Sequence, residues 1–257
     1  MSKALIGYTG FVGSNLLKQQ QFDDCYNSSN IHQIAGKEYE QIICAGVSAV
    51  KWMANREPEK DRENIQSLMA HLKQVKADKF ILISTVDVYP VPINVDEKTE
   101  VHLDECQPYG KHRLELEYFV KNDFDSVVIR LPGLFGTGLK KNIIYDFLND
   151  NDVDKINPNG SFQFYNLDHL TKDINIALKN SLTTLNISCE PIGVQEVAEV
   201  CLGHKLAKSA SSGVSYDYKS LYATLFGGSH GYLYNKQEVI ADLVAYKQEY
   251  MATSEKG

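Results

Sequence analysis

The 257-residue sequence lacks the features that define several large classes of protein. No apolar run approaches the ~18 residues of a membrane-spanning helix, and no signal-peptide pattern opens the chain. The five cysteines are scattered, odd in number and without a C-x-x-C pair, which argues against a disulfide framework and against a zinc site. We therefore expect a cytoplasmic protein with no membrane partner and no metal.

Positive charge is also in short supply. Lysine and arginine total 26 against 33 aspartates and glutamates, and the two signs are interspersed, so no basic stripe would neutralise the phosphates of a nucleic acid. Nucleic-acid binding is therefore not expected. The remaining composition, 43% hydrophobic and 23% charged, is ordinary for a globular protein, and the length allows one domain with a smaller lobe.

A glycine pattern stands at the start of the chain. Residues 4–6 are apolar, glycines occupy positions 7, 10 and 13, and a helical pattern follows. This order is typical of a strand, a tight turn and a helix whose first backbone amides face an anion such as a dinucleotide pyrophosphate. The spacing G-x-x-G-x-x-G differs from the commoner G-x-G-x-x-G, and a glycine-rich turn with no ligand is the alternative.

Two further strand ends are candidates for cofactor contact. The predicted strand 24–27 runs into the polar residues Asn27, Ser28, Ser29 and Asn30. At this place an acid would favour the ribose hydroxyl of NAD and a basic residue the 2′-phosphate of NADP; the sequence has neither, so the choice stays open, as does a plain polar turn. The predicted strand 40–46 ends in Ala45 and Gly46, which we expect along the cofactor.

Strands and helices alternate through the first half of the chain. Continuous apolar runs predict buried strands over 80–84 and 126–130, and helices are predicted over 59–76 and from residue 108. An irregular loop is expected over 47–58. The alternation predicts an α/β fold with a Rossmann-type, doubly wound parallel sheet.

The rhythm changes from about residue 137. Helices are predicted over 143–148, 167–178 and 194–201, and strands over 162–165 and 185–187. A last helix follows Asn235 and Glu238, whose spacing is that of a capping box.

Four motifs carry a family resemblance. In chain order they are Gly7-x-x-Gly10-x-x-Gly13, Ser84-Thr85 followed by Val88-Tyr89, Tyr109-Gly-Lys-His-Arg113, and Arg130-x-Pro132-Gly133-x-Phe135-Gly136. Together they resemble the extended short-chain dehydrogenase/reductases, in the branch of NAD-dependent epimerases and dehydratases that act on nucleotide sugars. The resemblance implies an NAD(P)-binding domain over 1–136, to which about 160–190 returns, and a smaller C-terminal substrate lobe formed mainly by 137–257.

The resemblance also implies roles for single residues. Thr85 would hydrogen-bond the substrate oxygen and Tyr109 would transfer its proton. Cofactor contacts would come from Gly7, Thr9, Gly10, Phe11, Val12, Gly13, Asn27, Ser28, Ser29, Ala45, Gly46, Ser84 and Pro132. Asp87, Arg130 and Gly133 would lie toward the substrate, although a structural ion pair for Arg130 and a solvated loop position for Asp87 are open alternatives.

Position 113 departs from the family pattern, which has a lysine four residues after the tyrosine and so one helical turn later. A tyrosine can act as a proton carrier near neutral pH only if its pKa falls from about 10, and a nearby cation lowers it. Arg113 keeps the charge and could stabilise a Tyr109 phenolate and bind the nicotinamide ribose. Its planar guanidinium is nevertheless a poor geometric substitute for an ammonium.

The sequence therefore predicts an NAD- or NADP-dependent oxidoreductase, epimerase or dehydratase that acts on a nucleotide-linked sugar and is weakened by Arg113. The alternative is a non-catalytic NAD(P)-binding regulatory or scaffold protein of the same fold. Arg113→Lys should raise activity in the first case and change nothing in the second. Family members pair through the helices expected to contain 60–76 and 109–121, so the resemblance also implies a homodimer.

Overall fold

The computed structural model describes residues 2–254 and divides them into two compact units. Unit 1 is drawn from Met1–Pro92, Glu97–Leu131 and Leu170–Asn186. Unit 2 is drawn from Ile93–Asp96, Pro132–His169 and Ile187–Gly257. Among the helices within the described residues, none has the length and apolar character needed to cross a membrane.

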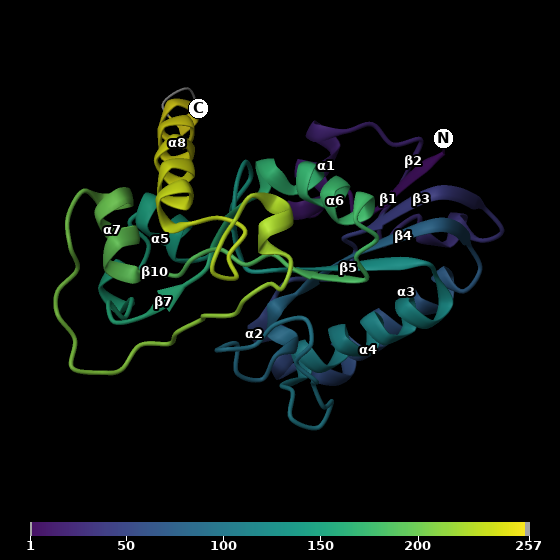
Figure 1. Cartoon of the computed structure of the whole chain (residues 1–257), viewed down its shortest axis with the longest axis horizontal. Helices are drawn as coiled ribbons and strands as arrows, with labels where there is room; N and C mark the ends of the chain where they lie inside the picture. Colours follow the sequence, from purple (N-terminus) through teal and green to yellow (C-terminus); the bar gives the residue numbers. More distant parts are fainter. Residues whose placement is uncertain (1, 255–257) are drawn as a thin grey trace. The chain divides into compact units, whose positions relative to one another are not determined.

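A six-stranded sheet forms the centre of unit 1 (Figure 1). Its order is β2-β1-β3-β4-β5-β9, and every neighbouring pair is parallel. The strands are β1 (Lys3–Ile6), β2 (Asp24–Tyr26), β3 (Glu38–Cys44), β4 (Lys76–Thr85), β5 (Ser126–Leu131) and β9 (Thr184–Asn186). Every residue of β5 is buried, as expected of a parallel strand covered on both faces. The predicted α/β fold with a doubly wound parallel sheet is confirmed.

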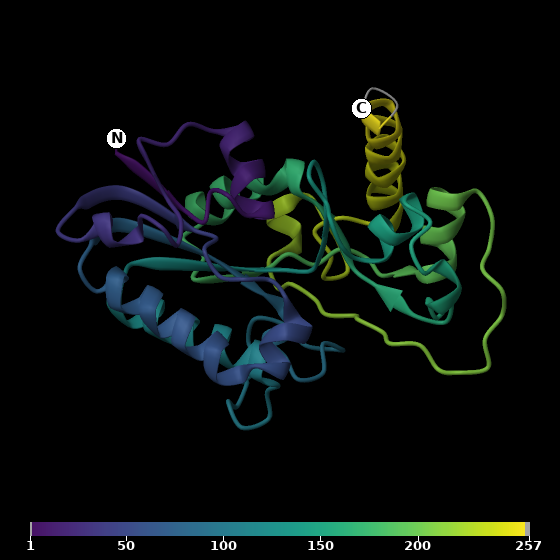
Figure 2. The same cartoon turned by 180° about the vertical axis from the view of Figure 1, so that it is seen from behind.

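Helices cover both faces of this sheet. They are α1 (Phe11–Gln19), α2 (Lys51–Arg56), α3 (Pro58–Leu72), α4 (Pro108–Asp123) and α6 (Leu170–Lys179), with short 3-10 turns η1 (Ile31–Ile34) and η2 (Val86–Val88). Figures 1 and 2 show α3 and α4 on one face and α1 and α6 on the other. The core under α3 and α4 contains Ile42, Phe80, Leu116 and Val128.

The prediction of an irregular loop over 47–58 is partly wrong, because residues 51–56 form the helix α2. The helix buries Ala54 against the unit and ends just before Pro58, which occupies the first turn of α3. A proline suits that position because its missing N–H would have no partner there. The consequence for the site is that Lys51 and Asn55 lie on a regular element.

Unit 2 is built from short elements. Its helices are α5 (Ile143–Leu148), α7 (Val194–Leu202) and α8 (Lys236–Ser254), with 3-10 turns η3 (Val153–Lys155), η4 (Leu167–His169) and η5 (Ala223–Phe226). Strand β6 (Gly133–Phe135) pairs in parallel with β8 (Phe164–Asn166), and β7 (Ser161–Phe162) pairs antiparallel with β10 (Ile192–Gly193). The predicted strand over 162–165 is thus divided between β7 and β8.

The predicted capping box at the start of α8 is confirmed. The backbone N–H of Asn235 donates to Glu238 Oε2 at 2.8 Å, and the N–H of Glu238 donates to Asn235 Oδ1 at 3.0 Å. Two backbone donors at the helix start are satisfied by this exchange.

Candidate functional site

The glycine turn after β1 contains two glycines that the chain itself requires. Gly7 has φ +85°, and a Cβ there would lie 2.4 Å from the Ala45 carbonyl oxygen. A Cβ on Gly13 would lie 2.1 Å from the Gly7 carbonyl oxygen. Both distances are far inside van der Waals contact, so these glycines permit the close approach of β1, β3 and α1 whether or not a ligand binds.

Gly10 differs from the other two glycines of the turn. Its φ of −79° is open to any residue, and an added Cβ would come no closer than 3.3 Å to protein atoms. Gly10 is exposed and is the N-cap of α1, yet it has no side chain with which to cap the helix. A side chain here would crowd only the Gly7 carbonyl oxygen, by a few tenths of an ångström, so packing constrains Gly10 much less than Gly7 and Gly13.

The start of α1 has the chemistry of an anion site. No acidic residue lies in its first turn, and no side chain caps the backbone amides that follow Gly10. Unsatisfied N–H groups and the positive end of the helix dipole favour a phosphate there. The residues present, with Thr9 exposed and Phe11 and Val12 half-buried, fit a dinucleotide pyrophosphate.

The polar turn after β2 is held mainly by its own side chains. Asn27 Oδ1 accepts from the N–H of Ser29 at 2.9 Å and from its hydroxyl at 2.6 Å, and Asn30 Oδ1 accepts from the N–H of Asn27 at 2.7 Å. Asn27 Nδ2 also reaches the Tyr8 hydroxyl at 3.3 Å. The turn is thus tied to the glycine turn, while Ser28 is exposed. Turn formation accounts for Asn27 and for the Ser29 hydroxyl without a ligand.

Thr85 and Tyr109 meet where β4 ends and α4 begins. The Thr85 side chain lies close enough to the Tyr109 phenol to contribute to lowering its pKa. The N–H of Asp87 donates to Thr85 Oγ1 at 3.1 Å, and the N–H of Tyr109 donates to Asn55 Oδ1 at 2.9 Å. Thr85 is thus the last residue of β4 and is bonded to η2, and the backbone of Tyr109, in the first turn of α4, is bonded to α2.

The environment of Tyr109 keeps its phenol protonated. Burial raises the pKa of Tyr109, and the Asp87 carboxylate adds to this effect. The charges of Arg113 and Lys51 and the nearby Thr85 side chain lower the pKa, but it stays above its ordinary value. The phenol is thus an acid in this state of the protein, and further positive charge would be needed to make it a base near neutral pH.

The Arg113 guanidinium forms an ion pair with Asp61 of α3. Its Nη1 donates to Asp61 Oδ2 at 2.7 Å and its Nη2 to Asp61 Oδ1 at 2.9 Å. Nη1 also donates to the Tyr109 carbonyl at 2.8 Å, and Nη2 to the Ser48 carbonyl at 2.6 Å. Within residues 2–254, four of its five N–H groups are thus occupied, which leaves only the Nε–H for the expected contact with a ribose.

The guanidinium of Arg113 also lies on the Tyr109 ring, with its central carbon 3.8 Å from the ring centroid. This is a cation–π contact with the ring. His112 adds its Nδ1 to the same carboxylate, 2.8 Å from Asp61 Oδ2. The Arg113 guanidinium therefore lies next to Tyr109, as the spacing predicts. It contacts the face of the Tyr109 ring and the Asp61 carboxylate.

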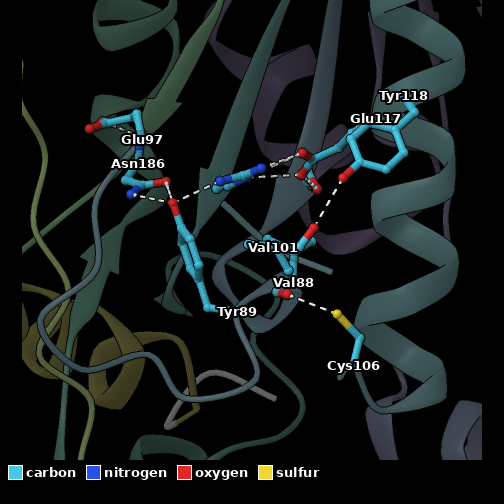
Figure 3. A network of polar contacts seen from close by, with 10 residues as sticks. Val88, Tyr89, Glu97, Val101, Cys106, Glu117, Tyr118 and Asn186 are labelled. Carbon is cyan, nitrogen blue, oxygen red and sulfur yellow. Dashed lines mark hydrogen bonds and ion pairs between the residues drawn. The ribbon is translucent and has the colours of Figure 1, made fainter. Parts of the chain in front are cut away.

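Arg130 belongs to a buried polar network, and its partners Glu117 and Tyr89 are labelled in Figure 3. Its Nε and Nη2 donate to Glu117 Oε1 at 3.0 Å and Oε2 at 2.6 Å, and its Nη1 donates to the Tyr89 hydroxyl at 2.7 Å. Arg130 is 5% exposed and Glu117 is 0% exposed. Ser84 also donates its hydroxyl to Glu117 Oε1 at 2.6 Å. The structure thus favours the ion-pair alternative for Arg130 and turns the Ser84 hydroxyl toward the same acid.

The remaining predicted residues lie in different places. Asp87 is not simply a solvated loop acid, because Lys51 Nζ lies 2.8 Å from its Oδ1. Ala45 and Gly46 follow β3 beside Gly7. Pro132 and Gly133 belong to unit 2, where the N–H of Gly133 donates to the Gln163 carbonyl.

Several partners of the site were not predicted from the sequence. Asp61 stands four residues before Ile65 on the apolar stripe of α3, and Glu117 stands three residues after Leu114 on α4. An acid on a buried helix stripe indicates that a cation is buried beside it. The sequence positions of Asp61 and Glu117 could therefore have predicted a buried ion pair at each. Lys51 carried no such signal, because no helix was expected there.

The fold has clear relatives among solved structures. A UDP-glucose 4-epimerase from Thermotoga maritima aligns with a TM-score of 0.72 at 15% identity, over 98% of this chain and 99% of that one. A dTDP-4-dehydrorhamnose reductase from Clostridium acetobutylicum aligns with a TM-score of 0.71 at 15% identity, over 98% and 100%. MoeE5, solved with UDP-glucose and NAD, aligns with a TM-score of 0.68 at 16% identity, over 98% and 100%.

No protein-family model and no curated protein matches the sequence. At the identities above, the structural likeness is one of fold. It confirms that the chain has the fold of the nucleotide-sugar epimerases and reductases, which the four motifs implied.

Proposed function

We propose that this chain binds NAD or NADP and oxidises, reduces, epimerises or dehydrates a nucleotide-linked sugar. The observation that carries the proposal is the proximity of Thr85 to the Tyr109 phenol, in the same unit as a glycine turn whose exposed Gly10 begins a helix without a side-chain cap. The structural relatives include proteins that their names describe as epimerases and reductases of nucleotide sugars. One of them was solved with both NAD and UDP-glucose.

The chain's own residues divide the work as follows. When bound, NAD or NADP supplies the hydride acceptor or donor. The amides at the start of α1 hold the pyrophosphate, and Ala45 and Gly46 lie along the adenosine half. Tyr109 gives a proton to the substrate oxygen or takes one from it, and Thr85 hydrogen-bonds the same oxygen. Dehydration would need a further acid or base, for which Asp87 is the nearest candidate on η2.

A non-catalytic binding protein is the second candidate, and one observation favours it. Arg113 is held by Asp61 and Ser48, so the charge four residues after Tyr109 cannot move toward a ligand as a lysine ammonium would. The raised pKa of Tyr109 points the same way. Such a protein would bind dinucleotide through the glycine turn and leave nucleotide sugars unchanged.

Turnover separates the two candidates. The purified protein would be incubated with NAD or NADP and with UDP-glucose, UDP-glucuronic acid and dTDP-linked sugars, and reduced nicotinamide and sugar products would be measured by absorbance and chromatography. An enzyme should give product that Tyr109→Phe reduces by a factor of about 100 or more, since general acid–base catalysis contributes this much. Dinucleotide binding without product from any of these sugars would favour the binding protein.

The proposed assembly is a cytoplasmic homodimer that pairs through α3 and α4. The two helices pack on each other, and an Arg62–Glu115 ion pair joins them at 3.1 Å. Sedimentation of the wild type and of an Arg62→Glu variant would test this: a dimer that the variant weakens supports it, and a monomer at all concentrations contradicts it.

A further inference from the structure

The segment that carries Lys51 is fastened to α4 on both sides of this residue. Before it, the Ser48 carbonyl accepts from Arg113 Nη2 at 2.6 Å. After it, Asn55 Oδ1 accepts from the N–H of Tyr109 at 2.9 Å. Lys51 is therefore held near the first turn of α4 by contacts that it does not itself make.

The segment that carries Asp87 is fastened to the same turn. A Cβ on Gly110 would lie 2.1 Å from the Asp87 carbonyl oxygen, so η2 and the start of α4 are in direct backbone contact. The N–H of Asp87 also donates to Thr85 Oγ1 at 3.1 Å. These backbone contacts hold η2 against the turn that carries Tyr109, where the Asp87 charge acts on the phenol.

Lys51 and Asp87 form an ion pair across this junction. Lys51 Nζ lies 2.8 Å from Asp87 Oδ1, with the lysine side chain 46% exposed and the aspartate side chain 21% exposed. The charged groups that act on Tyr109 are then Arg113 from α4, Asp87 from η2 and Lys51 from α2. Arg113 is already balanced by Asp61, so Lys51 is the cation that balances Asp87.

We propose that Lys51 is a second positioning cation of Tyr109, and that from α2 it balances the Asp87 charge and so adds to the electrostatic support that Arg113 gives. The inference rests on the proposed role of Tyr109 in proton transfer. When the phenol O–H bond breaks and an O–H bond forms on the substrate oxygen, a phenolate with one negative charge remains. With Lys51 in place, this charge forms beside an ion pair; without Lys51, the Asp87 carboxylate loses this counter-charge and the phenolate is less favourable.

The test measures Tyr109 directly and needs neither cofactor nor substrate. Tyr109 is replaced site-specifically by 3,5-difluorotyrosine, whose fluorines lower the phenol pKa into the range where proteins stay folded, and the single ring signal is titrated by fluorine NMR. The titration is repeated with Lys51→Met, Asp87→Asn, the double variant and Lys51→Arg. Lys60→Met, which removes an exposed lysine of α3, is the matched control.

The four proteins form a double-variant cycle, in which the effects of Lys51 and Asp87 on the titration midpoint of residue 109 should be coupled. Lys51→Met should raise the titration midpoint by about half a pH unit or more, Asp87→Asn should lower it, and the double variant should return it toward the original value. Lys51→Arg and Lys60→Met should leave it nearly unchanged. A midpoint that Lys51→Met does not move, or a rise that Asp87→Asn does not reverse, would overturn the inference.

This outcome is independent of the proposed activity. If the cycle behaves as expected and the protein binds no dinucleotide, the proposed function fails and the charge relationship stands. If dinucleotide binds and sugars turn over but the cycle is flat, the function stands and Lys51 has no part in it.

Discussion

Arg113 and Asp61 form a two-point hydrogen-bonded ion pair between α4 and α3, with N–O distances of 2.7 and 2.9 Å. Both side chains are buried, at 5% and 10% exposure. A buried cation of this kind is stabilising only while its acid stays in place. The arginine that departs from the family pattern is thus explained by a partner 52 residues earlier in the chain.

Arg113→Lys should destabilise the protein and should not raise its activity. A lysine ammonium cannot make both contacts with Asp61 and also reach the Ser48 and Tyr109 carbonyls, because it lacks the planar fork. We expect a loss of about 1–3 kcal/mol in the free energy of unfolding, measured by urea denaturation. Arg56→Lys, at an arginine side chain that is 62% exposed, is the control and should leave the unfolding curve unchanged.

The outcome that would contradict this account is a stable Arg113→Lys protein with higher turnover. It would mean that the arginine weakens an enzyme, as the sequence alone predicts, and that the pair with Asp61 is incidental.

Asp61 should make stability depend on pH in the acid range. Burial alone would raise the pKa of Asp61, but hydrogen bonds from Arg113 and His112, together with their charges, outweigh it and leave the pKa below its ordinary value. A carboxyl with a lowered pKa in the folded state stabilises the protein above its unfolded pKa of about 3.8, and the contribution is lost as pH falls through the folded value.

Asp61→Asn should therefore flatten the decline in unfolding free energy between about pH 5 and about pH 2. At pH 7 it should cost about 3 kcal/mol, because Arg113 loses its counter-charge. Asp123→Asn, at an exposed position of α4, is the matched control. Parallel pH curves for Asp61→Asn and the wild type would show that Asp61 is not held in its charged form.

The buried pair of Arg130 and Glu117 predicts a different pattern. Arg130→Met leaves the Glu117 carboxylate, which is 0% exposed, without its cation, and should cost about 3–5 kcal/mol. The double variant Arg130→Met/Glu117→Met should recover most of the loss, because no charge then remains buried. Recovery measured by thermal unfolding supports a structural role; a double variant as unstable as the single one would contradict it.

Alanine substitution should destabilise the protein to different extents at the three glycines of the first turn. Gly7→Ala and Gly13→Ala force a Cβ to within 2.4 and 2.1 Å of backbone oxygens, and each should cost about 3 kcal/mol or more in the ligand-free protein. Gly10→Ala should cost much less, since its backbone is unstrained and its one tight contact, 3.3 Å to the Gly7 carbonyl oxygen, requires a shift of only a few tenths of an ångström. Equal losses at all three positions in urea denaturation would refute this division.

The sequence was sufficient for the parallel sheet and for the places of Thr85 and Arg130 on it. Continuous apolar runs mark β4 and β5, and their ends place Thr85 and Arg130 at the carboxyl edge of the sheet. Helical spacing correctly places residue 113 one turn beyond Tyr109 and against its ring. These features depend on local periodicity, which a sequence displays directly.

Contacts between distant elements were beyond this reasoning. No local pattern says that Asp61 will accept the Arg113 guanidinium, or that Glu117 will accept both Arg130 and Ser84. The helix α2 was missed because its six residues contain a single buried position, Ala54, which is too short a pattern to show periodicity. Lys51 consequently had no predicted place, although it lies beside Asp87.

The measurement that tests the central claim most directly is calorimetric titration of the wild type, Gly10→Ser and Gly10→Asp with NAD, NADH, NADP and NADPH. Serine and aspartate are both good N-cap residues, so both variants should fold, but only the aspartate places a negative charge where the pyrophosphate would bind. We predict saturable binding of at least one dinucleotide to the wild type, weaker binding to Gly10→Ser and none to Gly10→Asp, with unchanged unfolding curves. A wild type that binds none of the four, or a Gly10→Asp protein that binds as tightly as the wild type, would contradict the account.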